Sequence, residues 1–175
     1  GVDELVIGVP RGDGNSGEPD SGEGYVYLTL DAFLLAASPP ATPVLLNVPA
    51  AEITQLDLVI ERAESLFGLR MACGDVNDDQ IDDLVVSAPM LDNSQLAADQ
   101  EIGAVYVFLG PIGGQNFLNE SAFLQDPIPQ AGKRFGSALV VTNMDGDPSD
   151  ELVIGVPGKE VLGMNNAGQI AIWSY

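Results

Sequence analysis

Histidine is absent from the 175-residue sequence, and cysteine, lysine and arginine are scarce. Without histidine, a Ser-His or Cys-His catalytic pair and a histidine-ligated zinc are excluded. Cys73 is the only cysteine, so no intrachain disulfide can form, and its neighbours Met71, Ala72 and Gly74 predict a small buried residue. The 6 basic residues stand against 26 acidic ones, which gives a formal charge of −20. This charge argues against nucleic acid or anionic lipid as a partner, because both require lysine and arginine.

Long apolar runs are missing as well. No stretch of 18 or more apolar residues occurs, so membrane insertion is not predicted. The hydrophobic content of 46% is nevertheless typical of a folded domain and not of a disordered acidic chain. The sequence begins at Gly1 without a basic region followed by an apolar signal. We therefore expect that a targeting segment has been removed or that this is a portion of a longer protein.

The sequence does contain three short motifs that recur in the same order. The first ends in proline and occupies residues 4–10, 83–89 and 151–157, at offsets of 79 and 68 residues. The second begins with glycine and occupies residues 24–28, 103–108 and 168–173. The third is a Phe-Gly pair, Phe67-Gly68 and Phe135-Gly136, which precedes the last two copies. Such self-similarity indicates an architecture built from repeated units.

Each motif reads as a short strand, because β-branched and aromatic residues cluster between Gly, Pro, Asn or Asp. The runs within residues 4–10, 83–89 and 151–157 are continuously apolar, which predicts strands covered on both faces. A weaker fourth strand is expected at residues 56–61 and 122–125. Residues 31–37 are the one stretch that favours a helical turn.

Four short strands per repeated unit are typical of a β-propeller blade. We therefore expect an all-β fold of four-stranded antiparallel blades, divided as residues 1–66, 67–134 and 135–175. The first unit lacks its opening strand and the third lacks its closing one. Three units also fall short of the four to eight blades of a closed propeller, so an incomplete propeller is predicted.

An acidic loop, residues 75–83 (the middle loop), lies between the first two strands of the second unit. Oxygen-bearing side chains occupy its positions 1, 3, 5 and 9, and a backbone carbonyl is available at position 7. Alternate oxygens in a tight loop point at one centre, which suits calcium with its six to eight oxygen ligands. The expected ligands are Asp75, Asn77, Asp79, the carbonyl of Ile81, and Asp83.

The third unit repeats this pattern in residues 143–151 (the third loop). Its expected calcium ligands are Asn143, Asp145, Asp147, the carbonyl of Ser149, and Glu151. In the middle loop, Asp75, Asp79 and Asp83 would form three pairs of carboxylates, and each pair ~4 Å apart repels by about 4 kcal/mol at an effective dielectric of 20, so a divalent ion or local unfolding must relieve the charge. Pro148 fits poorly, because its φ is fixed where such loops often turn with positive φ. In the first unit only Glu4 remains of such a loop.

The two Phe-Gly pairs, the Ser-Ala-Pro sequence at residues 87–89 and the middle loop together resemble the FG-GAP repeats of integrin α-subunit heads and of many secreted bacterial proteins. Asp78 and Gln80 stand where the calcium signature of that family usually has glycines. The resemblance implies a seven-bladed propeller with structural calcium on the face opposite the ligand surface. It also implies an extracellular or cell-surface location, and the scarcity of cysteine and lysine favours a bacterial member.

The predicted function is recognition or adhesion without catalysis, toward a protein or carbohydrate ligand that the sequence does not identify. The expected partners are the remaining propeller blades or other copies of the chain, which would close a ring. The alternative is a module of a secreted phospholipase or polysaccharide-degrading enzyme, in which Asp92 pairs with Asp99 or Glu101 as acid and base. Residues 11–13 spell Arg-Gly-Asp, the tripeptide that integrins bind, although so short a motif arises readily by chance.

Overall fold

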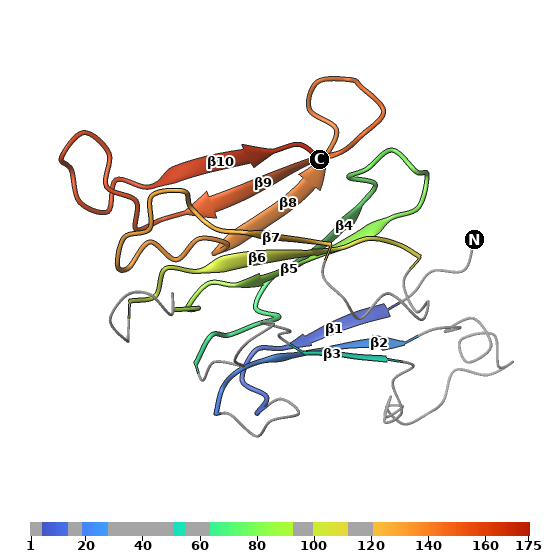
Figure 1. Ribbon diagram of the computed structural model, residues 1–175, viewed down its shortest axis with the longest axis horizontal. Coiled ribbons are helices and arrows are strands. Elements are labelled where there is room, and N and C mark those ends of the chain that lie inside the picture. Colours follow the sequence, from blue (N-terminus) through green and yellow to red (C-terminus); the bar gives the residue numbers. More distant parts are fainter. Residues whose placement is uncertain (1–4, 14–18, 28–50, 55–63, 93–99, 112–120) are drawn as a thin grey trace, which may run out of the picture.

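A computed structural model describes residues 5–13, 19–27, 51–54, 64–92, 100–111 and 121–175. Ten strands form three antiparallel sheets, and no helix occurs in these residues. Figure 1 shows the sheets stacked one above another as layers that fan apart, without closing into a ring. The prediction of an all-β, incomplete propeller is therefore confirmed. In the described residues no helix is long and apolar enough to cross a membrane.

The strands follow the repeated motifs. The first sheet contains β1 (Leu5–Val9), β2 (Glu23–Tyr27) and β3 (Ala51–Thr54). The middle sheet contains β4 (Met71–Gly74), β5 (Asp83–Ala88), β6 (Ala104–Phe108) and β7 (Ala122–Leu124). The third sheet contains β8 (Ala138–Thr142), β9 (Glu151–Val156) and β10 (Gln169–Trp173). Each sheet thus runs in chain order, and every neighbouring pair is antiparallel.

The weaker fourth strands have different outcomes. The strand expected at residues 122–125 is β7. The strand expected at 56–61 and the helical turn expected at 31–37 lie outside the described residues. In the first sheet the strand next to β2 is β3, which precedes the expected position.

The continuous apolar runs are explained by the middle sheet, which has a core on each face. Every residue of β5 and β6 is buried. Their side chains alternate between two clusters. One cluster, with Phe67, Val86 and Tyr106, packs toward the first sheet and includes Val6 of β1. The other, with Val85 and Val105, packs toward the third sheet. An apolar residue is therefore favoured at nearly every position of these two strands.

The Phe-Gly pairs join one sheet to the next. Phe67 forms a parallel backbone bridge with Gly22, just before β2, and Phe135 forms one with Gly103, just before β6. The strand register makes these glycines equivalent, since Val9 opposes Glu23 and Ala88 opposes Ala104.

The sequence comparison aligned residue 24, and not residue 22, with residue 103, so the register corrects that alignment by two positions. A two-residue shift leaves every side chain on its own face of the strand. The alternation of residue types therefore could not reveal the shift.

Cys73 corrects another expectation, because it is exposed and not buried. The pleat places it on the same face of β4 as Met71, which packs against the first-sheet side of the core. Since β4 is an edge strand, the core that partly covers Met71 does not extend as far as Cys73.

A buried ion cluster also joins the middle and third units. Asp126 lies after β7, and its Oδ2 is 3.1 Å from Lys133 Nζ and 2.9 Å from Lys159 Nζ. Burial alone would raise the pKa of Asp126, but the Ile128 N–H and the two ammonium groups hold it below its ordinary value. The pKa of Lys133, whose side chain is fully buried, is lowered, because desolvation outweighs its attraction to Asp126. The two lysines and Asp126 thus depend on one another.

Candidate metal centre

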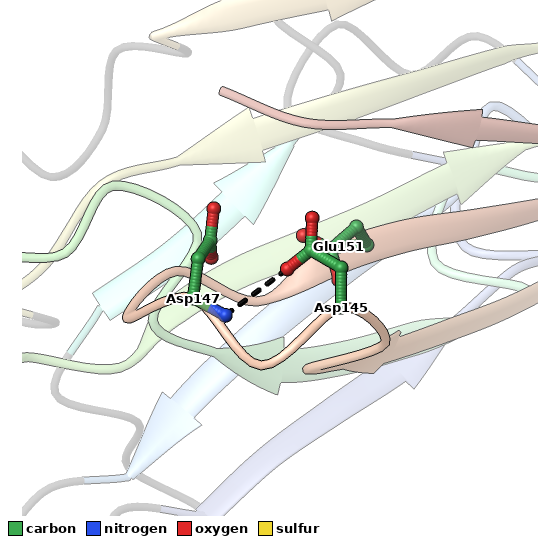
Figure 2. A group of neighbouring side chains, drawn as sticks. All are labelled: Asp145, Asp147 and Glu151. Carbon is green, nitrogen blue, oxygen red and sulfur yellow. Dashed lines mark hydrogen bonds between the residues drawn. The ribbon is translucent and has the colours of Figure 1, made fainter.

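The third loop, which connects β8 to β9, gathers three carboxylates. Asp145, Asp147 and Glu151 each offer an oxygen, and these oxygens lie within 4.8 Å of one another. Figure 2 shows the three side chains at the turn, with Glu151 at the start of its strand. The Asp147 N–H donates to Asp145 Oδ1 at 3.1 Å, which keeps the loop tightly wound. Three negative charges this close repel strongly unless a cation lies among them.

Glu151 gives the third loop its most specific feature. The residue is 5% exposed, and its Oε2 accepts a hydrogen bond from the Met144 N–H at 2.6 Å. Its other oxygen, Oε1, is buried and has no hydrogen-bond partner among the described residues. A buried carboxylate oxygen without a partner is costly, so a ligand is expected there. An oxygen beside two further carboxylates suits a hard cation such as calcium.

The other two expected ligands of the third loop take part in its folding. Asn143 Oδ1 accepts a hydrogen bond from the Gly146 N–H at 2.7 Å, while its Nδ2 donates to the Asp147 carbonyl. The Ser149 N–H and hydroxyl both donate to Asp147 Oδ1, at 3.0 and 3.1 Å. These bonds orient the Asp147 carboxylate. Among the described residues, no hydrogen bond places the Ser149 carbonyl beside the three carboxylates.

In the middle loop, which connects β4 to β5, the buried acid is fully bonded. Asp83 Oδ1 accepts from the Gly110 N–H at 2.8 Å, and Oδ2 accepts from the Val76 N–H at 3.0 Å. Burial raises the pKa of Asp83. The two N–H donors oppose this rise, and the negative charges of Asp79 and Asp75 add to it. The middle loop, like the third, carries an excess of negative charge, with five acidic residues against four in the third loop.

The other two acids expected as ligands in the middle loop, Asp75 and Asp79, accept hydrogen bonds from groups of the same loop. Asp75 accepts from the N–H groups of Asp79 and Gln80, at 3.1 and 2.7 Å. Asp79 Oδ1 accepts from the Ile81 N–H, and Asp79 Oδ2 accepts from the Asn77 amide. Within the described part of the chain, only the third loop brings three carboxylates within 4.8 Å. In the middle loop, the Asp75 and Asp79 carboxylates instead accept hydrogen bonds from N–H groups of the loop itself.

The turn of the middle loop forms without glycine. Asp78 and Gln80, which replace glycines of the family signature, have φ of 59° and 65°. Asp is one of the residues that tolerate this region, and Gln80 is held there by its hydrogen bond to Asp75. In the third loop Gly146 has φ of 87°, whereas Pro148 cannot adopt such an angle. The two loops thus turn differently at position 6.

Comparison with known proteins agrees with this geometry. The FG-GAP repeat family model matches residues 67–108, which run from the Phe-Gly pair to the end of β6. The chain contains an FG-GAP repeat. The match includes the whole middle loop, while the third unit shares its strand order and loop position.

Integrin α subunits are similar to this chain, and integrin alpha-8 is similar to it over nearly its whole length. Integrin alpha-8 of Gallus gallus is 28% identical over 180 residues, covering 98% of this chain and 14% of that protein. Integrin alpha-5 of Xenopus laevis is 31% identical over 99 residues, covering 55% of the chain and 9% of that protein. Integrin alpha-PS5 of Drosophila melanogaster is 34% identical over 98 residues, with the same coverages. The chain therefore spans 14% or less of the length of these relatives.

Four further acidic residues were singled out in the sequence, namely Glu4, Asp92, Asp99 and Glu101. Glu4 and Asp99 lie outside the described residues. Asp92 accepts hydrogen bonds from the N–H groups of Gln100 and Glu101, both at 2.8 Å, so it closes the loop between β5 and β6. Glu101 forms an ion pair with Arg134 at 2.5 Å. These two acids thus have structural partners.

The Arg-Gly-Asp tripeptide lies directly after β1. The side chain of Arg11 is 76% exposed and stands 3.6 Å from Asp20, and Asp13 is exposed as well. The Gly12 N–H donates to the Val9 carbonyl, which makes the tripeptide part of a turn. The tripeptide is therefore accessible, with its arginine near an acid of the same chain.

One functional contact escaped the sequence analysis. Asp150, in the third loop, donates its N–H to the Asp75 carbonyl at 2.7 Å and accepts the Asp75 N–H on its Oδ2 at 3.1 Å. The signal that could have found it is the recurrence of aspartate at position 8 of both loops, Asp82 and Asp150. Asp82 is exposed, whereas Asp150 contacts the neighbouring loop.

Proposed function

We propose that the chain is a calcium-binding segment of an integrin-like β-propeller, in which the metal stabilises the fold. The observation that carries this proposal is the buried, unpartnered Oε1 of Glu151 beside Asp145 and Asp147. Calcium would supply positive charge at the point where repulsion is strongest, and it would satisfy that oxygen. The proposed calcium ion would have a structural role and no catalytic one.

The residues that would hold the ions are the ten predicted from the sequence. In the third loop these are Asn143, Asp145, Asp147, Ser149 and Glu151. In the middle loop they are Asp75, Asn77, Asp79, Ile81 and Asp83. The pKa of Asp83 is raised first by burial and then by the charges of Asp79 and Asp75, which a cation would offset. The middle-loop side chains would exchange their present backbone hydrogen bonds for the ion. We also retain the division into units of residues 1–66, 67–134 and 135–175.

Calorimetric titration of the metal-free chain with calcium tests this proposal. We expect about two sites in the native chain, and about one after Glu151→Gln, which removes the charge but preserves the size of the side chain. Glu160→Gln is the matched control, because Glu160 is an exposed acid of the same unit outside the loop. Heat of binding that is absent from the native chain, or unchanged by Glu151→Gln, would contradict the third-loop site.

We further propose that this segment serves extracellular recognition or adhesion and is not an enzyme. Similarity to integrin α subunits over 98% of the chain supports the location and the class of function. Among the described residues, Asp92 and Glu101 both have structural partners, which disfavours the enzyme alternative that pairs them as acid and base. A screen of carbohydrate and ester substrates tests this. Turnover that disappears in Asp92→Asn would establish the hydrolase alternative instead.

The proposed partner of the third sheet is a further FG-GAP unit. Val140, Ile170 and Ile172 are 52%, 68% and 58% exposed on its outer face. This face also carries a hollow of about 400 Å³ lined by residues that include Gly155, Gly168 and Ile170. The equivalent place on the middle sheet, beside Gly103, holds a Phe-Gly pair of the next unit. Sedimentation decides between occupants, because a concentration-dependent dimer or ring would mean that a second copy fills the hollow.

A further inference from the structure

The two proposed calcium loops contact each other directly through Asp150 and Asp75. The Asp150 N–H donates to the Asp75 carbonyl at 2.7 Å, and Asp150 Oδ2 accepts the Asp75 N–H at 3.1 Å. Both backbone groups of Asp75 are thus held by one residue of the neighbouring unit. Asp75 is position 1 of the middle loop, and Asp150 immediately precedes Glu151, position 9 of the third loop. The bridge therefore joins the first proposed ligand of one site to the last of the other.

The residues around the bridge leave little room for independent movement. Val76 is fully buried in the cluster between the middle and third sheets. A Cβ on Gly74 would lie 2.6 Å from Asp150 Oδ2 and would also overlap the Val141 side chain, so the backbone here is in close contact with the third unit. Packed groups of this kind move together and not separately. Glu151, which follows Asp150 directly, is thus connected to Asp75 through this packed contact.

We propose that Asp150 couples the two loops, so that calcium in one raises the calcium affinity of the other. This inference rests on the proposed function. An ion bound by Glu151 fixes the backbone of Asp150, and Asp150 in turn fixes Asp75 in its ligand position. The second ion then binds a middle loop that is already ordered, so its binding costs less conformational entropy. This is positive cooperativity. Coupling of this kind typically changes affinity by about 5-fold or more.

The charge of Asp150 opposes the repulsion that two neighbouring divalent ions would otherwise exert. Two substitutions separate this contribution from the hydrogen bond. Asp150→Asn keeps an oxygen that can accept the Asp75 N–H but removes the charge. Asp150→Ala removes the charge and this acceptor, and leaves only the hydrogen bond from the Asp150 N–H to the Asp75 carbonyl. Asp82→Ala is the matched control, because Asp82 holds the same position 8 in the middle loop and is exposed. Its removal takes away one carboxylate and leaves the bridge intact.

Calcium titration of the full chain tests the coupling as a double-mutant cycle. Asp145→Asn combined with Asp147→Asn disables the third loop at two exposed positions, and the calcium affinity of the middle loop is then measured. We expect that affinity to fall about 5-fold or more in the native background and to change less than twofold in the Asp150→Ala background. In the Asp82→Ala background the full fall should persist. An intermediate fall with Asp150→Asn is the expected sign that charge and hydrogen bond both contribute.

A spectroscopic measurement reports the bridge itself. In a chain whose middle loop is disabled by Asp79→Asn, calcium added to the third loop should shift the amide signal of Asp75. Asp150→Ala should reduce that shift, because the Asp75 N–H then loses its side-chain acceptor. Two loops that bind calcium with independent affinities would overturn the coupling alone. A chain that binds no calcium would overturn the proposed function and the coupling with it, so the two failures are distinguishable. Thermal denaturation in chelator establishes that each variant is folded.

Discussion

Phe135 forms a parallel backbone bridge with Gly103, and the Phe135 N–H also donates to the Ile102 carbonyl at 2.9 Å. A Cβ on Gly103 would lie 2.5 Å from the Phe135 nitrogen and closer still to its carbonyl oxygen. Glycine is thus required at this position by the approach of the next unit as well as by its φ of 82°. This contact between Gly103 and Phe135 therefore fixes the position of the third unit relative to the middle sheet.

The first prediction separates these two requirements. Gly103→Ala should lower the free energy of unfolding by about 1–3 kcal/mol more than Gly168→Ala, because overpacking is added to the strain of positive φ. Gly168 is equivalent in register and has φ of 79°, but the atom nearest to its Cβ position is 3.6 Å away. Urea denaturation of both variants measures the difference. Equal losses would mean that the bridge to Phe135 contributes nothing.

The second prediction concerns the two faces that the register makes equivalent, represented by Val105 and Ile170. Val105 is fully buried and Ile170 is 68% exposed. Val105→Thr should destabilise the chain by about 1–3 kcal/mol, because it buries a hydroxyl in an apolar cluster. Ile170→Thr should stay within about 0.5 kcal/mol of the native chain. A large loss with Ile170→Thr would show that the outer face of the third sheet is already covered.

The third prediction uses the ion cluster around Asp126. Asp126→Asn should destabilise the chain by about 3–5 kcal/mol, because Lys133 then keeps its buried ammonium without a counter-charge. Replacing both Asp126 and Lys133 by apolar residues should cost less than Asp126→Asn alone. Chemical denaturation near neutral pH measures both variants. A loss below about 1 kcal/mol for Asp126→Asn would indicate that the cluster is solvated in solution.

The stability of the chain at acidic pH should also depend on the Asp126 carboxylate. The pKa of Asp126 is lower in the folded chain than its ordinary value of 3.8. Its contribution to stability is therefore fully present above that value and is lost as the pH falls through the folded pKa. Between about pH 5 and pH 3 the native chain should lose stability more steeply than Asp126→Asn. Identical slopes would contradict this assignment.

The fourth prediction is a reversal of sign at Glu151. In chelator, Glu151→Gln should leave the melting temperature unchanged or raise it, because it removes one of three repelling charges. In calcium the native chain should gain stability, by about 2.7 kcal/mol per site at a concentration 100 times the Kd, and the variant should gain correspondingly less. Calorimetric melting in both buffers measures this. A variant that is destabilised equally in chelator and in calcium would assign Glu151 a purely structural role.

The sequence determined the all-β class, the recurrence of the unit and the positions of both acidic loops. It could do so because strands buried on both faces need continuous apolar runs such as residues 83–89, and because alternate oxygens in a short loop are a local pattern. The two Phe-Gly pairs could also be identified as a repeated motif in the sequence. These features depend on residues close together in the chain, and local chemistry is what a single sequence records.

Only the tertiary structure decided how the units meet. The equivalence of Gly22 with Gly103 follows from strand register, which a two-residue shift conceals because it leaves every side chain on its own face. The bridge between Asp75 and Asp150 spans 75 residues, and nothing in either local pattern selects the partner. The lack of a hydrogen-bond partner for Glu151 Oε1 likewise depends on which groups surround this oxygen in the folded chain. Contacts between units are set by the packing of whole sheets, so they become visible only when those sheets are placed side by side.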